Sequence, residues 1–311
     1  MIISLPDTTT REISRTLLEA QENYSLATGR VLTLLVSARE NDDLDSILLS
    51  VREATMEHPA RVLVMILGDS SAPTSLDAEA ILTADAGVSE MVVMHLKGEL
   101  THHLDAVVTP LLLPDTPIVA WWPTTAPARP AEAPLGRIVQ RRITNARRNV
   151  SGNALLRLSN GYTPGDSDMM WSRITLWRGI VASVLDRDLS ERVMAVEITG
   201  PVDNPSVDIA AGWLASCLNV DVVRNPAEDS CAIIENVPIT KLVLSRASGD
   251  IVIAVVDEQS VRVSIPGLPD SYVAMTARTD AECLAEELRH LDPDTSYARA
   301  LNSLSHVVET H

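Results

Sequence analysis

Phenylalanine is absent from the 311 residues of this chain, and lysine occurs only at positions 97 and 241. The three cysteines, Cys217, Cys231 and Cys283, are scattered and form no CxxC pair. An odd number of separated cysteines argues against a disulfide framework and against a zinc site, and it is typical of reduced thiols in a cytosol. We therefore expect a cytoplasmic protein.

Long hydrophobic runs are also missing. The longest ones, such as 111–113 and 251–256, are far shorter than the ~20 residues that a membrane helix needs. The N-terminus has no basic region followed by an apolar region, so we expect no signal peptide. The net charge of −17 argues against nucleic acid and anionic membranes as partners, because both would be repelled.

Familiar catalytic motifs are absent as well. There is no GxGxxG after a strand and no GxxxxGKS/T, which removes the two best-understood nucleotide cradles. There is no GxSxG nucleophile elbow and no HExxH. His102 and His103 are adjacent, and adjacent side chains on a helix diverge by about 100°, so they are poorly placed to share a metal ion. We expect no catalytic residue, no metal and no cofactor.

Two patterns of secondary structure are present. Up to about residue 122, buried strand patterns such as RVLVMILGD at 61–69 alternate with amphipathic helices. This alternation predicts an α/β layer with a largely parallel sheet. Later in the chain, adjacent strand patterns across 241–278 are followed by helices, which predicts an α+β fold with an antiparallel meander.

The length predicts two domains, because 311 residues are too many for one ordinary core. PTTAPARPAEAP at 123–134 has four prolines in twelve residues and is typical of a semi-rigid connector or lid. We expect an N-terminal α/β domain at 1–160, which includes this connector, and a C-terminal α+β domain at 161–311.

Positive charge is concentrated in one window. Residues 137–178 contain eight arginines and two aspartates, a net charge of +6, so the rest of the chain carries −23. The planar guanidinium binds phosphate and carboxylate groups in a bidentate way, which makes the window a candidate site for a phosphorylated ligand or an acidic protein surface. The alternative is internal neutralisation, in which these arginines pair with the chain's own carboxylates.

TPGDSDMMWSRITLWRG at 163–179 predicts a helix from about 167 to 187 with its cap. One apolar stripe runs along it, which is typical of a helix that packs into a core. The stripe consists of Met170, Ile174, Trp177, Val181 and Val184. Asp166 and Asp168 precede the helix and are expected to cap it, because exposed amides at a helix start stabilise carboxylates. A DxD metal site of an unrecognised enzyme is the alternative.

Tryptophan and arginine flank this stripe. Trp171 and Arg178 lie on one flank, and an exposed Trp–Arg pair is typical of an interface hot spot. Arg173 lies at the other margin and has to be paired, because an unpaired buried charge is costly. Trp121 and Trp122 end a predicted strand, where adjacent side chains face opposite ways, so one is expected in the core and the other exposed.

Long motifs resemble one family. LLLPDTPIVAWWP (111–123), GRIVQRRITNA (136–146) and GYTPGDSDMMWSRITLWR (161–178) resemble the OpcA family, the bacterial glucose-6-phosphate dehydrogenase assembly proteins. LPDTTT, EHPARV and AECLAEELRHLDPD fit the same family, so the likeness covers nearly the whole chain. The chain has Gly-Asp-Ser-Asp where the family usually has Gly-Asp-Thr-Asp, and it keeps the hydroxyl. The bulkier Met169-Met170 precedes the tryptophan.

The resemblance implies a non-catalytic partner that assembles or allosterically activates glucose-6-phosphate dehydrogenase, the enzyme that makes NADPH at the entry to the oxidative pentose phosphate pathway. The alternative is a sensor that binds a phosphosugar or nucleotide in an arginine-rich pocket between the domains. We expect contacts to the partner or ligand from Trp121, Trp122, Arg137, Arg141, Arg142, Asp166, Asp168, Trp171, Arg173 and Arg178. Of these, we expect Trp122, Trp171, Arg141, Arg142 and Arg178 to be exposed.

Overall fold

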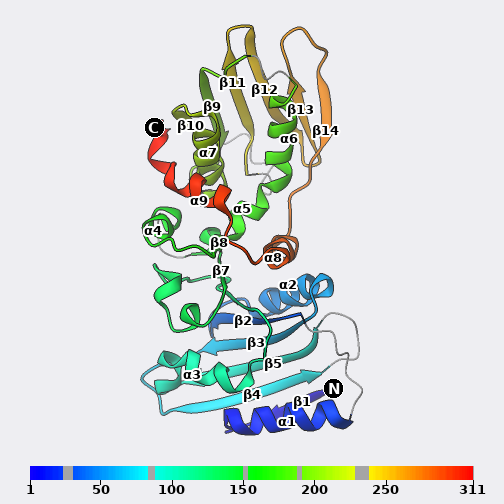
Figure 1. Ribbon diagram of the computed structural model, residues 1–311, viewed down its shortest axis with the longest axis vertical. Helices are drawn as coiled ribbons and strands as arrows, with labels where there is room; N and C mark the ends of the chain where they lie inside the picture. Colours follow the sequence, from blue (N-terminus) through cyan, green and yellow to red (C-terminus); the bar gives the residue numbers. More distant parts are fainter. Residues whose placement is uncertain (24–30, 83–87, 150–152, 188–190, 228–237, 311) are drawn as a thin grey trace. The chain divides into compact units, whose positions relative to one another are not determined.

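The computed structural model describes the chain except for residues 24–30, 83–87, 150–152, 188–190, 228–237 and 311 (Figure 1). The described residues form two compact units. The first contains 1–152, 161–168 and 280–293, and the second contains 153–160, 169–279 and 294–311. The units therefore interleave along the chain, which passes from one to the other five times. The expected domain boundary after residue 160 stays a prediction.

The first unit contains an eight-stranded sheet. Its strands, in sheet order, are β1 (Ile2–Leu5), β4 (Ser75–Leu82), β5 (Val88–Lys97), β3 (Ala60–Leu67), β2 (Leu32–Arg39), β6 (Ile118–Trp121), β7 (Arg141–Thr144) and β8 (Asp166–Asp168). β4 runs antiparallel to β1 and β5, and the other neighbouring pairs are parallel. The expected α/β layer with a mostly parallel sheet is confirmed.

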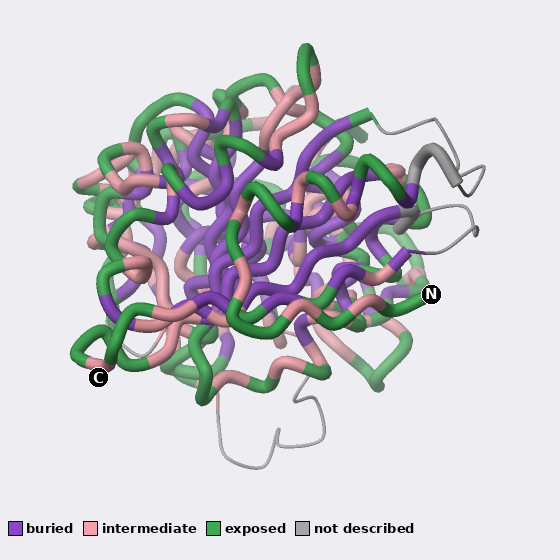
Figure 2. The backbone as a smooth tube through the Cα atoms, turned by 90° about the horizontal axis from the view of Figure 1, so that it is seen from below, coloured by how far each residue is buried: buried purple, intermediate pink, exposed green. Residues whose placement is uncertain are grey.

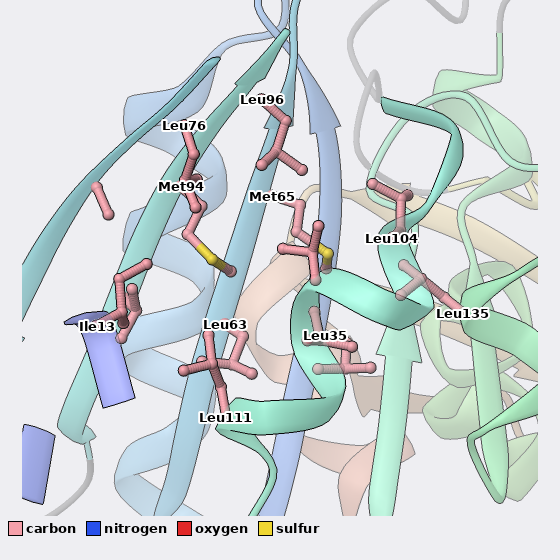
Figure 3. Packing of buried hydrophobic residues seen from close by; sticks show 14 of the residues in the cluster. Ile13, Leu35, Leu63, Met65, Leu76, Met94, Leu96, Leu104, Leu111 and Leu135 are labelled. Atoms are coloured by element: carbon pink, nitrogen blue, oxygen red, sulfur yellow. The ribbon is translucent and has the colours of Figure 1, made fainter. Parts of the chain in front are cut away.

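Helices lie on both faces of this sheet. The helices are α1 (Thr10–Asn23), α2 (Leu44–Glu57), α3 (Leu104–Val108) and α8 (Asp280–Arg289), with short 3-10 turns η1 (Gly98–His102), η2 (Thr109–Leu111), η3 (Pro130–Glu132), η4 (Leu135–Arg137) and η5 (Ala146–Arg148). Side chains alternate along a strand, so Leu35, Leu63 and Met65 share one face. They form a buried cluster with Ile13 of α1 and Leu104 of α3 (Figure 3).

The proline-rich segment at 123–134 packs into this unit. Pro130 is buried in η3, and Ala126 and Ala133 lie against the same hydrophobic cluster as Leu35. Trp122 belongs to that cluster too. The segment therefore helps to cover the end of β6.

The second unit contains a seven-stranded sheet. Its strands, in sheet order, are β14 (Ser271–Ala274), β13 (Ser260–Ser264), β12 (Gly249–Asp257), β11 (Lys241–Arg246), β9 (Ala195–Gly200), β10 (Val222–Pro226) and β15 (Val307–Glu309). Neighbours from β14 to β9 are antiparallel, and the β9–β10 and β10–β15 pairs are parallel. The expected antiparallel meander is confirmed.

The helices of the second unit are α4 (Ala154–Asn160), α5 (Met169–Arg173), α6 (Thr175–Leu185), α7 (Pro205–Leu218) and α9 (Thr295–Asn302), with the turn η7 (Leu304–His306). Leu242, Leu244 and Ile253 are buried, while the residues between them on each strand are more exposed. Figure 2, in which the whole chain is coloured by burial, shows buried segments in the interior and exposed ones along the outside. Half-buried strands of this kind are typical of an antiparallel sheet with one covered face.

The single helix expected at 167–187 is wrong. Its first residues form strand β8, and the helical part breaks at Ile174, whose φ of −96° and ψ of 8° separate α5 from α6. The apolar stripe is nevertheless confirmed. Its five residues are buried: Met170, Ile174, Trp177, Val181 and Val184.

Candidate functional site

The ten residues expected at the site fall into two groups, one in each unit. The first unit holds Trp121, Trp122, Arg137, Arg141, Arg142, Asp166 and Asp168. The second unit holds Trp171, Arg173 and Arg178.

Arg142 lies on β7 directly opposite Asp166 on β8. Its Nε donates to Asp166 Oδ1, and its Nη2 donates to the carbonyl of Pro164 at 2.6 Å. The amide of Thr163 donates to the other carboxylate oxygen of Asp166 at 2.8 Å. The turn at 163–166 therefore surrounds the buried Arg142 guanidinium with the Asp166 carboxylate and the Pro164 carbonyl.

Arg141 is the sequence neighbour of Arg142, but it faces the other side of the sheet, because strand side chains alternate. There it pairs with Glu287 of α8 and donates to the carbonyl of Asp292 at 3.1 Å. Ser167 shares that face and donates to Glu287 at 2.6 Å. Glu287 is 2% exposed, so this is a buried ion pair with a second hydrogen bond to its carboxylate.

Asp168 returns to the face of Asp166. Its Oδ2 accepts hydrogen bonds from Thr144 Oγ1 at 2.6 Å and from the amide of Ala146 at 2.9 Å. The expected helix-capping role is wrong for Asp166, which lies in β8 and binds Arg142 of β7 and the amide of Thr163. Asp168 directly precedes α5, so its capping role stays a prediction. Across the described ranges, no three His, Cys, Asp or Glu side chains are grouped so that they could hold a metal ion.

The turn before β8 needs a glycine at 165. Its φ is +97°, a conformation that other residues rarely adopt. A Cβ there would lie 2.6 Å from the carbonyl oxygen of Gln140 and 2.8 Å from Nη2 of Arg142. The glycine therefore lets the chain pass close to the guanidinium that Asp166 binds.

Burial dominates the electrostatics of Asp166. Desolvation raises the pKa of its carboxyl group, and this outweighs the lowering by Arg142 and by the amide of Thr163. The ion pair therefore compensates only part of the cost of taking the carboxylate out of water.

Trp121 and Trp122 are both buried, at 1% and 5% exposure. The expectation that one of them is exposed is therefore wrong. β6 lies inside the sheet between β2 and β7, and Trp122 packs with the cluster that Ala126 and Ala133 cover. Arg137, at the end of η4, is exposed.

In the second unit, Trp171 and Arg178 meet as their spacing predicts. The Arg178 guanidinium carbon lies 3.5 Å from the Trp171 ring centroid, within cation–π range. The Trp171 indole N–H donates to Asp294 at 2.7 Å, and its ring centroid lies 5.9 Å from that of Tyr297. Trp171 is 3% exposed, so the expected exposed flank is wrong for this residue.

Arg173 donates to the carbonyl of Arg278, and Arg278 donates to the carbonyl of Ser172 at 2.6 Å. This reciprocal contact ties α5 to the segment after β14. It agrees with the expectation that Arg173 is paired at the margin of the apolar stripe.

Internal neutralisation describes at least three of the eight arginines in the window. Arg141, Arg142 and Arg148 pair with Glu287, Asp166 and Asp280, the last at 2.9 Å. Arg141 and Arg142 are 4% and 6% exposed, so their expected exposure is wrong. Both arginines lie on β7, and each pairs with a carboxylate of the same unit.

Sequence reasoning missed Glu287, Asp294 and Arg278, which lie more than 100 residues from their partners. Glu287 did leave a signal, because it lies one turn after Cys283 and beside Leu288 on the buried side of α8. A glutamate there needs a buried cation. Asp294 is recognisable as the N-cap of α9, but that pattern says nothing of Trp171.

Cys217 and Cys283 are free thiols, and Cys231 lies outside the described residues. Within the described part of the chain, no helix combines the length and apolar character that crossing a membrane requires.

Comparisons with known proteins give one clear family. Residues 51–160 match the model of the glucose-6-phosphate dehydrogenase subunit N-terminal domain, and residues 164–301 match that of the C-terminal domain of the same subunit. No curated protein matches the chain. A crystal structure of a Gfo/Idh/MocA family oxidoreductase from Vibrio cholerae is similar over 88% of this chain and 94% of its own, with 9% identity. The TM-score of 0.37 is too low to support any conclusion.

Proposed function

We propose that this chain, which belongs to the OpcA family of glucose-6-phosphate dehydrogenase subunits, assembles or activates that dehydrogenase without catalysing the reaction itself. The observation that carries the proposal is that two models named for one such subunit together match residues 51–160 and 164–301. In this role the chain works in the bacterial cytoplasm, where the dehydrogenase supplies NADPH at the entry to the oxidative pentose phosphate pathway.

Activation of this kind requires differential binding. The chain has to bind the active oligomer or conformer more tightly than the inactive one, because only such a difference shifts the equilibrium. A tenfold shift needs about 1.4 kcal/mol of that difference. The buried arginine pairs suit a scaffold role, since they hold β7, β8 and α8 together. Contacts to the dehydrogenase then come from side chains that stay exposed.

Co-purification with the dehydrogenase, followed by its activity with and without this chain, tests the proposal. We expect a complex and a change in kcat, KM or thermal stability of the dehydrogenase. The absence of both a complex and any kinetic effect would sink it.

Arg137 is the predicted contact residue that is exposed, so Arg137→Glu provides a sharper test. Charge reversal at the rim of an interface chiefly slows association, and we expect a loss of affinity of about three- to tenfold at low salt. Arg129→Glu is the matched control, because Arg129 is also exposed in the neighbouring turn and pairs locally with Glu132. Equal binding by both variants would remove Arg137 from the interface.

The phosphosugar or nucleotide sensor has less support. The arginine window and the Asp166/Asp168 motif are its expected binding groups. Within them, Arg141 and Arg142 already pair with Glu287 and Asp166. Thermal-shift measurements with glucose 6-phosphate, 6-phosphogluconate and NADP test this function. A flat response to all three would argue strongly against it.

A further inference from the structure

β14 is the last strand at one end of the second unit's sheet and pairs with β13 (Figure 1). The amide of Met275 donates to the carbonyl of Gln259, which makes the Ala274–Ser260 pair a non-hydrogen-bonded pair of the antiparallel ladder. Val273 and Ser271 therefore bond to β13. By alternation, the N–H and C=O groups of Tyr272 and Ala274 point away from the sheet, toward an additional strand.

A groove runs beside this free edge. It has a volume of about 250 Å³ and lies between α6 and the β13–β14 edge. Its apolar lining includes Leu176, Ile180, Val263 and Val273. Leu176 is 49% exposed, although it is a large apolar side chain. A Cβ added at Gly179 would meet nothing within 4 Å, so the helix surface is open at the middle of the groove.

A small cavity of about 20 Å³ shares Leu176 with this groove and continues along the segment after β14. The charged side chains that line the groove and the cavity are Arg187, Arg173 and Arg278. Among the described residues, no carboxylate lines either of them. Arg173 and Arg278 line the small cavity and donate to backbone carbonyls, whereas Arg187 lines the open groove. In a chain with 42 acidic and 25 basic residues, a groove whose charged lining is an arginine favours an acidic residue in a bound segment.

We propose that the β14 edge and the α6 groove bind an extended segment of the partner, which adds a strand to the sheet. Main-chain hydrogen bonds form with Tyr272 and Ala274, while apolar side chains at alternate positions enter the groove. An acidic residue of the segment lies beside Arg187. This segment belongs to glucose-6-phosphate dehydrogenase, an assignment that rests on the proposed function.

Proline at position 272 tests the added strand. The N–H of Tyr272 does not bond to β13, so Tyr272→Pro leaves the β13–β14 ladder intact and removes a donor from the free edge. Tyr272→Thr is the matched control, because it removes the ring and keeps the N–H. The probe is dehydrogenase purified from the same organism. We expect Tyr272→Pro to bind it about tenfold more weakly, because one main-chain hydrogen bond is lost and an acceptor of the bound segment is left unpaired. Tyr272→Thr should bind within about twofold of the unaltered chain.

Circular dichroism and thermal melting show whether Tyr272→Pro still folds. A second set of variants keeps the test decisive if it does not. Ile180→Asp places a charge in the groove, and Leu49→Asp places the same charge on an exposed apolar position of α2 in the other unit. We expect Ile180→Asp and Arg187→Glu to weaken binding, and Leu49→Asp and Arg187→Lys to leave it nearly unchanged.

The outcomes separate this inference from the proposed function. If the unaltered chain neither forms a complex with the dehydrogenase nor changes its activity, the proposed function fails. If it does form a complex, and Tyr272→Pro, Ile180→Asp and Arg187→Glu all bind the dehydrogenase as tightly as the unaltered chain, the proposed function is kept. The proposed docking edge is then wrong. Light scattering on the chain alone identifies a third result. If the chain alone forms dimers and Tyr272→Pro dissociates them, the edge binds a second copy of this chain. That result would overturn the assignment to the dehydrogenase.

Discussion

Arg141 and Arg142 are adjacent in the sequence, yet they face opposite sides of one strand and bind different carboxylates. Buried pairs of this kind are costly to break, because removing one partner leaves an uncompensated charge. An exposed pair on the same helix as Glu287 provides a direct contrast, since Arg289 of α8 contacts Glu57 at 3.1 Å with both side chains more than half exposed.

We expect Glu287→Ala to destabilise the protein by about 3–5 kcal/mol, because Arg141 loses its buried partner. Glu57→Ala should change stability by less than about 1 kcal/mol, since water screens the exposed pair. Urea unfolding followed by circular dichroism measures both free energies. Similar values for the two variants would contradict a special role for burial.

Asp166 should give stability a pH dependence. Burial raises the pKa of its carboxyl group in the folded state above the unfolded value of about 3.9, so the folded state binds the proton more tightly. The stability that this provides is complete below the unfolded pKa and is lost as the pH rises through the folded pKa. We expect the stability of the unaltered chain relative to Asp166→Asn to fall as the pH rises from about 4, in urea titrations at several pH values. A rising difference would mean that the Arg142 pair dominates instead.

Two glycines, one before β8 and one in α6, differ in whether the backbone requires them. Gly165 adopts a positive φ in the turn before β8 and has no room for a side chain. Gly179 lies on an open surface of α6. The same substitution should therefore act in opposite directions at the two positions.

We expect Gly165→Ala to cost roughly 1–3 kcal/mol through backbone strain alone, with a further loss from displacing Arg142. Gly179→Ala should stabilise the helix by up to about 1 kcal/mol, because alanine is the better helix former. Thermal and urea unfolding of both variants measure the difference. A stabilising Gly165→Ala would show that the turn can relax.

At the scale of the whole molecule, each compact unit draws on separate parts of the chain. The first unit includes β8 and α8, which follow residue 160. These two elements supply Asp166 and Glu287, the carboxylates that pair with Arg142 and Arg141. A fragment that ends at residue 160 therefore contains both arginines and neither partner.

We expect the fragment 1–160 to lack a cooperative unfolding transition. Without β8 and α8, the edge of β7 is exposed, and Arg141 and Arg142 lose their carboxylate partners. Differential scanning calorimetry of this fragment and of the full chain tests the expectation. A sharp heat-absorption peak for 1–160 would show that the N-terminal segment folds independently.

The sequence by itself determined the local features of this protein. Periodicity gave the parallel and antiparallel sheets and the buried stripe from Met170 to Val184, because the spacing of apolar residues reflects which side of an element is covered. The long motifs also sufficed for the family. Trp171 and Arg178 could be paired because they are two turns apart.

Only the tertiary structure decided which polar residues are buried and what they bind. The sequence predicts Asp166 as a helix cap, but in the fold it lies opposite Arg142 of β7. The sequence predicts Trp122 as exposed, but in the fold it packs in a cluster that the proline-rich segment covers. Glu287 and Arg141 are 146 residues apart, and a pairing at that separation leaves no local pattern. The free energy of a buried charge depends on partners brought close by the fold, so it cannot be read from neighbours in the chain.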